Sequence, residues 1–420
     1  KIMAKKQLTG RGDIIYNNIK KLAKEKAMSR SNVVAVLDIG SKSVTALIGE
    51  KVGGDLSSVK GTGEYGYQGF SQGEWFDVPG LKNAVRAALN IAEVEAGVKV
   101  KKLYVGIPSE FLAVATKIIA YEFKRPSRIG SEQIDALFNK GDDFEKTAPG
   151  FSSVNCSAIY YVLDDNPKRI IEPRGFVAKK VTAELSYVLC EKDFLNLFDG
   201  LAEELGLKEI EYIPEAWAEA MGLLRPEQRD RYAVIVDVGY ITGSVAAIKG
   251  DGLLSLSSFS QGGGHIAGDI SVLLNLPFEV AEKVQSKLDL NLNYSEEEYF
   301  EVTGLEGEPL RISAKDAKDI AFARLDSIAN IIRQAFEIAG KDCPDYAAVY
   351  LTGGGLTEIR GAKEYLSASL NRPIEVLTSG LPRFDKPALA STMALFETAS
   401  KLSQQRKYGF IKKLLEKIGG

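Results

Sequence analysis

Continuous apolar runs alternate with amphipathic stretches along most of the chain. Runs rich in Val, Ile and Ala predict buried strands, and apolar residues recurring every three to four positions predict helices. The first strand is predicted at 33–38, a turn follows at 39–43, and a second strand is predicted at 44–50. Helical periodicity then covers 81–96, and the next apolar run, 103–107, predicts another strand. This alternation indicates an α/β protein.

The pattern changes between about 111 and 188. Short apolar runs there predict strands around a single helix, with the strands at 114–122, 157–163, 175–181 and 184–189 and the helix at 131–140. We interpret this region as a small α+β module inserted into a larger domain. A helix predicted at 192–205 and a strand near 209–213 return to the earlier pattern.

The opening pattern occurs again in the second half of the chain. Val234–Gly239 matches Val34–Gly40 in residue type, and in both segments D-x-G ends an apolar strand that a second apolar strand follows. The two aspartates, Asp38 and Asp237, are 199 residues apart. One repeat at this distance indicates two related domains that face each other, rather than a solenoid. A third glycine-rich element, 348–355, is a predicted strand that runs into a flexible turn.

Composition excludes several classes of protein. The 420 residues carry 53 Lys and Arg against 56 Asp and Glu, a net charge of −3 that does not favour a generic nucleic-acid binder. With one histidine, His265, the chain cannot build a multi-histidine metal site, and we interpret this residue as part of a turn in the G-G-G-H-I loop. Three widely separated cysteines predict neither a disulfide framework nor a zinc site, which favours a reducing cytoplasm.

Positive charge is concentrated at the two ends. Residues 1–30 carry nine basic and two acidic residues, and residues 406–420 carry five basic residues and one acidic residue. The part between them has a net charge of −14. This distribution suggests that the ends meet an anionic surface, although solvated tails are the simpler alternative. We expect 1–29 to be a flexible basic extension. No run of about 18 apolar residues is present, so any membrane association is predicted to be peripheral.

Glycine-rich turns after buried strands are candidate phosphate sites, because backbone N–H groups can converge there. A P-loop motif is absent. The glycines at 61, 63 and 66 form G-x-G-x-x-G, but the segment after them is not helical in pattern, so we do not expect a dinucleotide site. The two D-x-G turns are better candidates, since a carboxylate beside a glycine can hold hydrated Mg²⁺ while amides and hydroxyls bind phosphates. The alternative is that each aspartate only caps a hairpin.

Five motifs resemble those of the actin, Hsp70 and sugar kinase superfamily, and within it the FtsA family of bacterial cell-division actin homologues. They are L-D-I-G-S-K-S-V-T-A-L-I-G-E (37–50), V-D-V-G-Y-I-T-G-S (236–244), I-P-E-A-W-A-E-A (213–220), L-T-G-G-G-L-T-E-I-R-G (351–361) and Q-G-G-G-H-I-A-G-D-I (261–270). The first two resemble phosphate motifs, the third a connecting helix and the fourth an adenosine motif. The resemblance covers about 32–400, and the place of the inserted module is its most specific feature.

The resemblance implies a duplicated actin-like (ribonuclease H-like) α/β fold with ATP and Mg²⁺ between its halves. The implied subdomains are 1A (30–110 and 189–228), 1C (111–188, SHS2-like), 2A (229–260 and 343–400) and 2B (261–342). The implied nucleotide-binding residues are Asp38, Gly40, Ser41, Lys42, Ser43, Asp237, Gly239, Thr242, Gly243, Glu279, Glu282, Lys283, Gly353, Gly354 and Gly355. Asp38 and Asp237 would support Mg²⁺ through water.

Two positions depart from the family pattern. Tyr240 replaces a glycine of the second phosphate motif, where a bulky ring narrows the turn. Gln285 replaces an expected lysine near the ribose, although Glu279, Glu282 and Lys283 match the pattern. We therefore expect nucleotide binding with at most weak ATPase activity, and we assign no catalytic residue.

The last segment has the pattern of an amphipathic helix. Phe410, Ile411, Leu414, Leu415 and Ile418 form one stripe, with Lys412, Lys413 and Lys417 elsewhere around the helix. Such a helix lies in the bilayer interface, and FtsA proteins carry a membrane-targeting helix at this place. We therefore divide 401–420 into a short linker, 401–407, and a membrane helix. Packing against the body is the alternative.

The resemblance implies a peripheral protein of the cytoplasmic side of the cell membrane. It would polymerise there and anchor FtsZ filaments by binding the FtsZ C-terminal tail through 2B. Anionic lipids and other divisome proteins are further implied partners, and nucleic acid is not. Two alternatives stay open: an actin homologue of pilus assembly of the PilM type, and a sugar or acid kinase of the same superfamily.

Overall fold

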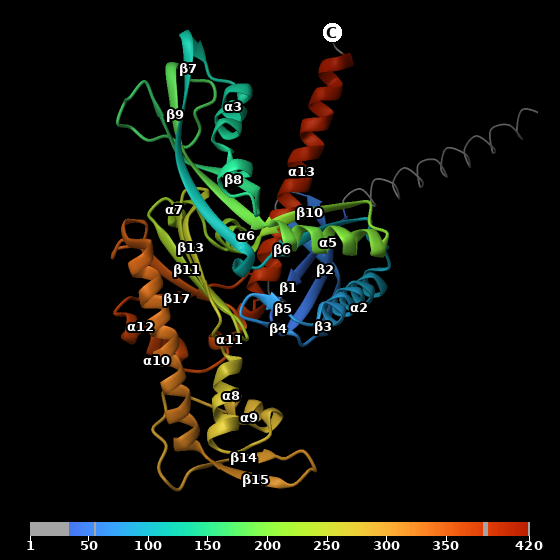
Figure 1. Ribbon diagram of the computed structural model, residues 1–420, viewed down its shortest axis with the longest axis vertical. Coiled ribbons are helices and arrows are strands. Elements are labelled where there is room, and N and C mark those ends of the chain that lie inside the picture. Colours follow the sequence, from blue (N-terminus) through green and yellow to red (C-terminus); the bar gives the residue numbers. More distant parts are fainter. Residues whose placement is uncertain (1–32, 54–55, 381–384, 419–420) are drawn as a thin grey trace, which may run out of the picture.

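The computed structural model describes residues 33–53, 56–380 and 385–418, and side chains are described outside 51–57 and 405–418. The predicted extension at 1–29 lies outside the described residues. Two lobes, each built on one five-stranded sheet, form the centre of the molecule, and a smaller module projects from each lobe toward opposite ends of the long axis (Figure 1).

The two central sheets have the same strand arrangement. The first has the order β10-β6-β1-β2-β3, with β1 Val33–Ile39, β2 Ser43–Gly53, β3 Leu56–Gly66, β6 Lys102–Ile107 and β10 Glu209–Pro214. The second has the order β13-β12-β11-β16-β17, with β11 Ala233–Val238, β12 Gly243–Lys249, β13 Gly252–Phe259, β16 Ala348–Thr352 and β17 Ile374–Val376. In each sheet the D-x-G strand pairs antiparallel with the next strand and parallel with a later one. The predicted duplication is therefore confirmed.

Strand β1 is a continuous apolar run because both faces of its sheet are covered. On one face Ala35 and Leu37 pack in a cluster with helices α2 (Val78–Ala96) and α5 (Lys192–Leu205). On the other face Val34 and Val36 pack with helix α13 (Ala390–Ile418). The remaining short elements of this lobe are β4 Phe70–Ser71, β5 Glu74–Trp75, α6 Glu215–Leu223 and α7 Pro226–Arg229.

The first two glycines of the G-x-G-x-x-G sequence allow strand β3 to pack closely on helix α2. A Cβ atom at Gly61 would lie 2.4 Å from the carbonyl oxygen of Ala92, and one at Gly63 would lie 2.0 Å from that of Ala88, both in helix α2. Helix α2 therefore approaches the strand more closely than any larger residue would allow. This agrees with the expectation that the motif is not a phosphate loop.

The inserted module is a three-stranded antiparallel sheet in the order β7-β9-β8, with β7 Leu112–Arg128, β8 Phe151–Leu163 and β9 Val177–Glu191. Helices α3 (Ser131–Gly141) and α4 (Phe144–Thr147) cover one face. The sequence predicted two strands at 175–181 and 184–189, which was wrong. They are one strand, because Val181, Ala183 and Leu185 continue a single alternation of buried side chains through the supposed break.

The module of the second lobe lies at the other end of the molecule (Figure 1). It comprises α8 Gly264–Leu273, α9 Phe278–Gln285, the hairpin β14 Tyr299–Thr303 and β15 Pro309–Ser313, and the long helix α10 Ala314–Ala339. Helices α11 (Gly354–Thr357) and α12 (Ala362–Leu370) follow β16.

Helix α13 differs from the sequence interpretation in two respects. Its first turns, with Met393, Leu395 and Phe396, pack on β1, β2 and α6 of the first lobe, whereas the sequence grouped 343–400 with the second. The helix also continues to Ile418 through the segment 401–407, which the sequence interpreted as a linker. That segment contains neither Pro nor Gly, so nothing in it ends a helix that has already formed. None of the helices in the described part of the chain is long and apolar enough to cross a bilayer.

Candidate functional site

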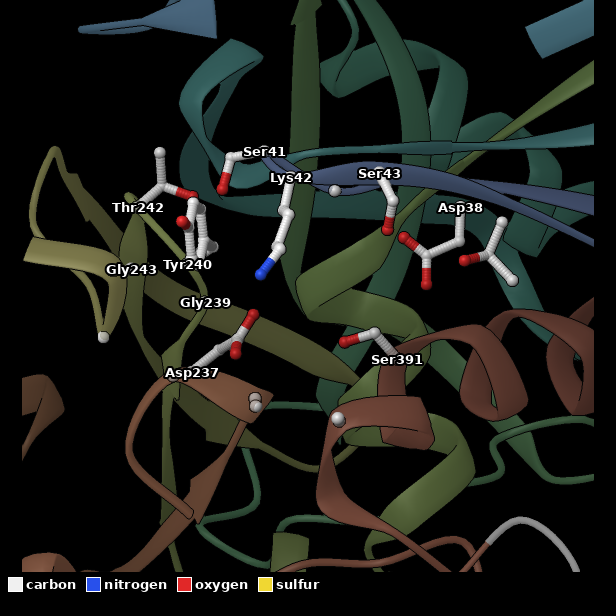
Figure 2. Close-up of a pocket in the computed structure, with 18 of the residues that line it drawn as sticks. Asp38, Ser41, Lys42, Ser43, Asp237, Gly239, Tyr240, Thr242, Gly243 and Ser391 are labelled. Carbon is white, nitrogen blue, oxygen red and sulfur yellow. The ribbon is translucent and has the colours of Figure 1, made fainter. Parts of the chain in front are cut away.

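A cavity of about 1150 Å³ lies between the two lobes (Figure 2). Both D-x-G turns, the turn after β16 and helix α9 contribute to its wall. All fifteen residues predicted to bind nucleotide line it: Asp38, Gly40, Ser41, Lys42, Ser43, Asp237, Gly239, Thr242, Gly243, Glu279, Glu282, Lys283, Gly353, Gly354 and Gly355. Asp38 and Asp237 enter from opposite sides, with Lys42 extended between them. The fold thus brings together segments up to about 300 residues apart, and their role in nucleotide binding stays a prediction.

Glycines at the back of the cavity allow three loops of the second lobe to meet backbone to backbone. Gly353 has φ +83°, and a Cβ atom there would lie 2.1 Å from Asp237 Oδ1. A Cβ atom at Gly355 would lie 2.0 Å from the carbonyl oxygen of Gly239. The N–H of Gly263 donates to that same carbonyl at 3.0 Å. Side chains at these positions would fill the cavity or separate the loops.

The two phosphate-type turns contact each other through a small polar cluster that we call the latch: Lys42, Tyr240 and Glu282. Lys42 Nζ lies 2.9 Å from Glu282 Oε1, and the Tyr240 hydroxyl donates to the same oxygen at 2.9 Å. Lys42 Nζ also lies 4.4 Å from the centroid of the Tyr240 ring. Tyr240 therefore does more than narrow the turn, because it connects the second turn to α9 and to the first lobe.

Two other positions discussed from the sequence have structural roles. Gln285 Nε2 donates to the carbonyl of Gly263 at 3.0 Å, so it supports the glycine loop where a lysine was expected. His265 does not line the cavity, and its Nδ1 accepts from the N–H of Gly262 at 3.1 Å. Burial lowers the pKa of His265. The sequence interpreted His265 as a turn residue, but it lies in the first turn of helix α8, and its side chain binds the glycine loop that precedes the helix.

Sequence reasoning missed three carboxylates that join the two aspartates: Glu110, Glu215 and Glu219. Glu110 and Glu215 line the cavity, whereas Glu219 is buried one turn after Glu215 on α6. Glu219 accepts a hydrogen bond from the Ser391 hydroxyl, and Asp38 accepts one from the Thr392 hydroxyl. The spacing of the two glutamates in I-P-E-A-W-A-E-A was a usable signal, because positions i and i+4 share one face of a helix.

Burial raises the pKa values of all five carboxyl groups. The pKa values of Glu215 and Glu219 are raised well above normal by burial and by the nearby carboxylates, and those of Asp38 and Glu110 are raised mainly by burial. The pKa of Asp237 rises to about 7. Asp237 Oδ1 and Glu215 Oε1 have no hydrogen-bond partner among the described residues. Such a cluster is destabilising by itself and favours binding of cations.

The carboxylate cluster predicts how stability depends on pH. The folded state keeps a proton on Asp237 up to about pH 7, whereas an unfolded aspartate loses it near 3.8, so the folded state binds more protons between these values. We therefore expect the free energy of unfolding, without nucleotide or divalent cations, to fall by a few kcal/mol from pH 5 to pH 8. Denaturant titration across this range measures it. Asp237→Asn should flatten the profile, and stability that rises with pH would contradict the prediction.

Comparison with solved structures defines the class of the fold. The chain is similar to the PilM–PilN type IV pilus biogenesis complex, with a TM-score of 0.59, 14% identity and coverage of 87% of this chain and 98% of that one. It is also similar to MreB5 of Spiroplasma citri bound to AMPPNP, with a TM-score of 0.52, 13% identity and coverage of 89% and 98%. The fold is therefore actin-like, as the sequence predicted.

Comparison of sequences narrows the resemblance. The family model described as cell division protein FtsA matches residues 234–394. FtsA of Staphylococcus epidermidis is 21% identical over 376 residues, which cover 89% of this chain and 80% of that protein. FtsA of Streptococcus pneumoniae is 23% identical over 386 residues (90% and 82%), and FtsA of Bacillus subtilis is 21% identical over 399 (91% and 87%). The chain thus resembles the FtsA cell-division proteins, which confirms the resemblance found in its motifs.

Proposed function

We propose that this chain is an ATP-binding, actin-like cell-division protein that assembles on the cytoplasmic side of the membrane and anchors FtsZ filaments there. The observation that carries the proposal is the convergence of all fifteen predicted nucleotide residues on one cavity between duplicated lobes. The resemblance to FtsA over about 90% of the chain supports the cell-division role.

The cavity fits a nucleotide with Mg²⁺ in three respects. Glycines leave the backbone of the turns accessible, since a Cβ atom at Gly353 would collide with Asp237. Hydroxyl groups of Ser41, Ser43 and Thr242 stand beside the turns as phosphate ligands. The unpartnered oxygen of Asp237 is a suitable acceptor for water bound to Mg²⁺. Bound Mg²⁺ would neutralise phosphate charge, and the similar MreB5 structure is described as bound to AMPPNP.

We expect any hydrolysis to be slow. A general base must be deprotonated to take a proton from water. Glu215 reaches the cavity, but burial and the carboxylates around it raise its pKa well above the usual range, which disfavours its deprotonated form. In the latch, Lys42 and Glu282 also form an ion pair with each other. These properties favour a protein that responds to nucleotide rather than one that turns it over rapidly.

Membrane attachment is assigned to the end of helix α13. The residues proposed for contact with lipid are Phe410, Ile411, Lys412, Lys413, Leu414, Leu415, Lys417 and Ile418. The helix leaves the body at the end of the molecule opposite to α8 and α9 (Figure 1). This arrangement would leave the far module available to partners in the cytoplasm.

We assign the binding site for the FtsZ tail to the module of the second lobe, which corresponds to the predicted subdomain 2B. Val272 and Leu273, at the end of α8, are 79% and 67% exposed, and Phe278 at the start of α9 is 38% exposed. Exposed apolar side chains in this number favour a peptide partner. Self-association into filaments is the other proposed interaction of the lobes.

An immobilised peptide of the FtsZ C-terminal tail tests the function. We expect the full chain with Mg-ATP to bind it, and Val272→Ser with Leu273→Ser to weaken binding about tenfold, because two anchoring side chains are lost. Val94→Ser with Ile338→Ser, two similarly exposed residues on α2 and α10, is the matched control and should bind normally. No binding of the unmodified chain would contradict the proposal.

A pilus-assembly role is the second candidate, favoured by the similarity to the PilM–PilN structure. It predicts binding to a peptide of a PilN-type partner and none to the FtsZ tail. Running both peptides in the same assay separates the two functions.

A further inference from the structure

The distal end of the inserted module has an unusual surface, which we call the tip: residues 123–128 at the end of β7 and 164–180, the β8–β9 loop with the start of β9. The strand register places the strand ends of the tip far from the body. β7 pairs through Leu112 with Cys190 at its root and through Arg128 with Val177 at its end. These strand ends therefore lie at the end of the module away from both lobes, whereas the loop before β9 turns back along β8, where Ile170 pairs with Tyr161.

Positive charge is concentrated on the tip. It carries eight Lys and Arg against three Asp and Glu, whereas the chain between residues 31 and 405 has a balance of −14. The acidic groups are engaged locally: Asp165 pairs with Lys180, Glu172 pairs with Arg174, and Asp164 accepts the backbone N–H groups of residues 179 and 180. Six exposed cations have no ion-pair partner among the described residues, namely Lys124, Arg125, Arg128, Lys168, Arg169 and Lys179, of which Arg169 lies over the ring of Tyr160.

Three apolar side chains stand exposed among these cations. Ile171 is 63% exposed, Phe176 53% and Val177 63%. Their backbone is fixed, because the N–H of Ile129 donates to the carbonyl of Phe176 at 2.9 Å and the N–H of Gly175 donates to the carbonyl of Ile129 at 2.9 Å. An ordered loop that holds an aromatic and two aliphatic side chains outward has a specific use, since burying them in the loop itself would have been the default.

We propose that the tip is a second membrane-contact surface, which inserts Ile171, Phe176 and Val177 into the interface of an anionic bilayer while its unpaired cations contact the headgroups. Cations interleaved with exposed apolar side chains are complementary to such a surface. Protein interfaces are instead depleted in lysine, and the tip is rich in it.

The tip and the C-terminal end of α13 point toward the same end of the long axis (Figure 1). One membrane surface can therefore contact both, and two linked contacts bind more strongly than either alone. The inference rests on the proposed membrane association but not on the nucleotide site or on FtsZ. Two contacts would also fix the orientation of the molecule on the membrane, which one helix does not.

Co-sedimentation of the full chain with vesicles tests the proposal. The vesicles contain equal amounts of phosphatidylcholine and phosphatidylglycerol, with phosphatidylcholine alone as the neutral reference. Ile171→Ser, Phe176→Ser and Val177→Thr together should weaken binding to anionic vesicles about tenfold. Val94→Ser with Ile338→Ser, which removes equally exposed apolar side chains elsewhere, should bind as the unmodified chain does.

The same assay with Leu414→Glu and Leu415→Glu separates the tip from the helix. If the tip variant loses binding, the proposal is supported whatever the helix variant does. If only the helix variant loses binding, the tip proposal fails and the proposed anchor stands. If neither variant loses binding, both fail.

A spectroscopic readout shows insertion directly. Phe176→Trp keeps an aromatic side chain at the tip, and its fluorescence, taken as the difference from the unmodified chain, should shift to the blue with anionic vesicles and be quenched by brominated lipid. Fluorescence unchanged by vesicles that bind the protein would overturn the proposal.

Discussion

Asp237→Asn is expected to weaken binding of Mg-nucleotide by roughly a hundredfold, because it removes a buried carboxylate from the proposed Mg²⁺ site. The same substitution should leave the nucleotide-free protein as stable as before, or more stable above pH 7, since it relieves repulsion among five carboxyl groups. Asp38→Asn should act in the same directions. Titration calorimetry with Mg-ATP and thermal unfolding without it measure the two effects.

The prediction is specific because nucleotide affinity should fall while the stability of the nucleotide-free protein should not. A residue that only supports the fold would lose stability and affinity together. Asp319→Asn makes the same change at an exposed position of α10 outside the cavity and should alter neither quantity. Unaltered Mg-ATP affinity in both cleft variants would refute the assignment of the two aspartates.

Leu414→Glu with Leu415→Glu should release the protein from anionic vesicles with a loss of affinity of about a hundredfold or more. Each apolar side chain in the stripe contributes roughly 1.5 to 3 kcal/mol when buried, and each basic residue near an anionic leaflet adds about 1 kcal/mol. An isolated helix of this length is too short to be stable in water. Here the segment continues α13, whose first turns are packed on the first lobe, which lowers the cost of ordering it.

Sedimentation with anionic vesicles measures the release, and circular dichroism checks that the variant stays folded. Gln404→Glu with Gln405→Glu adds the same two charges to the same helix but removes no apolar side chain, so it should reduce binding much less. High salt should weaken binding of the unmodified chain. Equal binding of both variants would show that charge, rather than the apolar stripe, holds the protein to lipid.

Local pattern was sufficient for most of the architecture. The run 33–38 could be assigned as a buried strand because every side chain in it is apolar up to Asp38, and both faces of its sheet are covered. The repeat of D-x-G near 237 predicted a second lobe with the same strand arrangement. The glycine turns, which the sequence assigned to nucleotide binding, line one cavity, and that binding stays a prediction. A glycine after a buried strand marks a backbone that something approaches closely.

Periodicity failed where a boundary depended on distant contacts. The sequence placed a break in β9 at residues 182–183, but these residues are paired on both sides by β7 and β8. The assignment of 390–400 to the second lobe followed chain order, whereas Met393 and Phe396 pack on the first. Neither the pairing of β9 on both sides nor the packing of α13 on the first lobe can be predicted from residues that are adjacent in the sequence.

The amino-acid sequence by itself determined most of the elements, the duplication and the glycine turns, since these depend on side-chain period and on glycine, which act over a few residues. Only the tertiary structure decided which ionisable side chains are buried away from water. Glu219 looks like a surface residue of a short helix, but it is buried and accepts a hydrogen bond from Ser391 of α13, 172 residues away. Likewise Lys42 meets Glu282 across 240 residues. Burial and pairing of this kind depend on packing between distant segments, which no local pattern encodes.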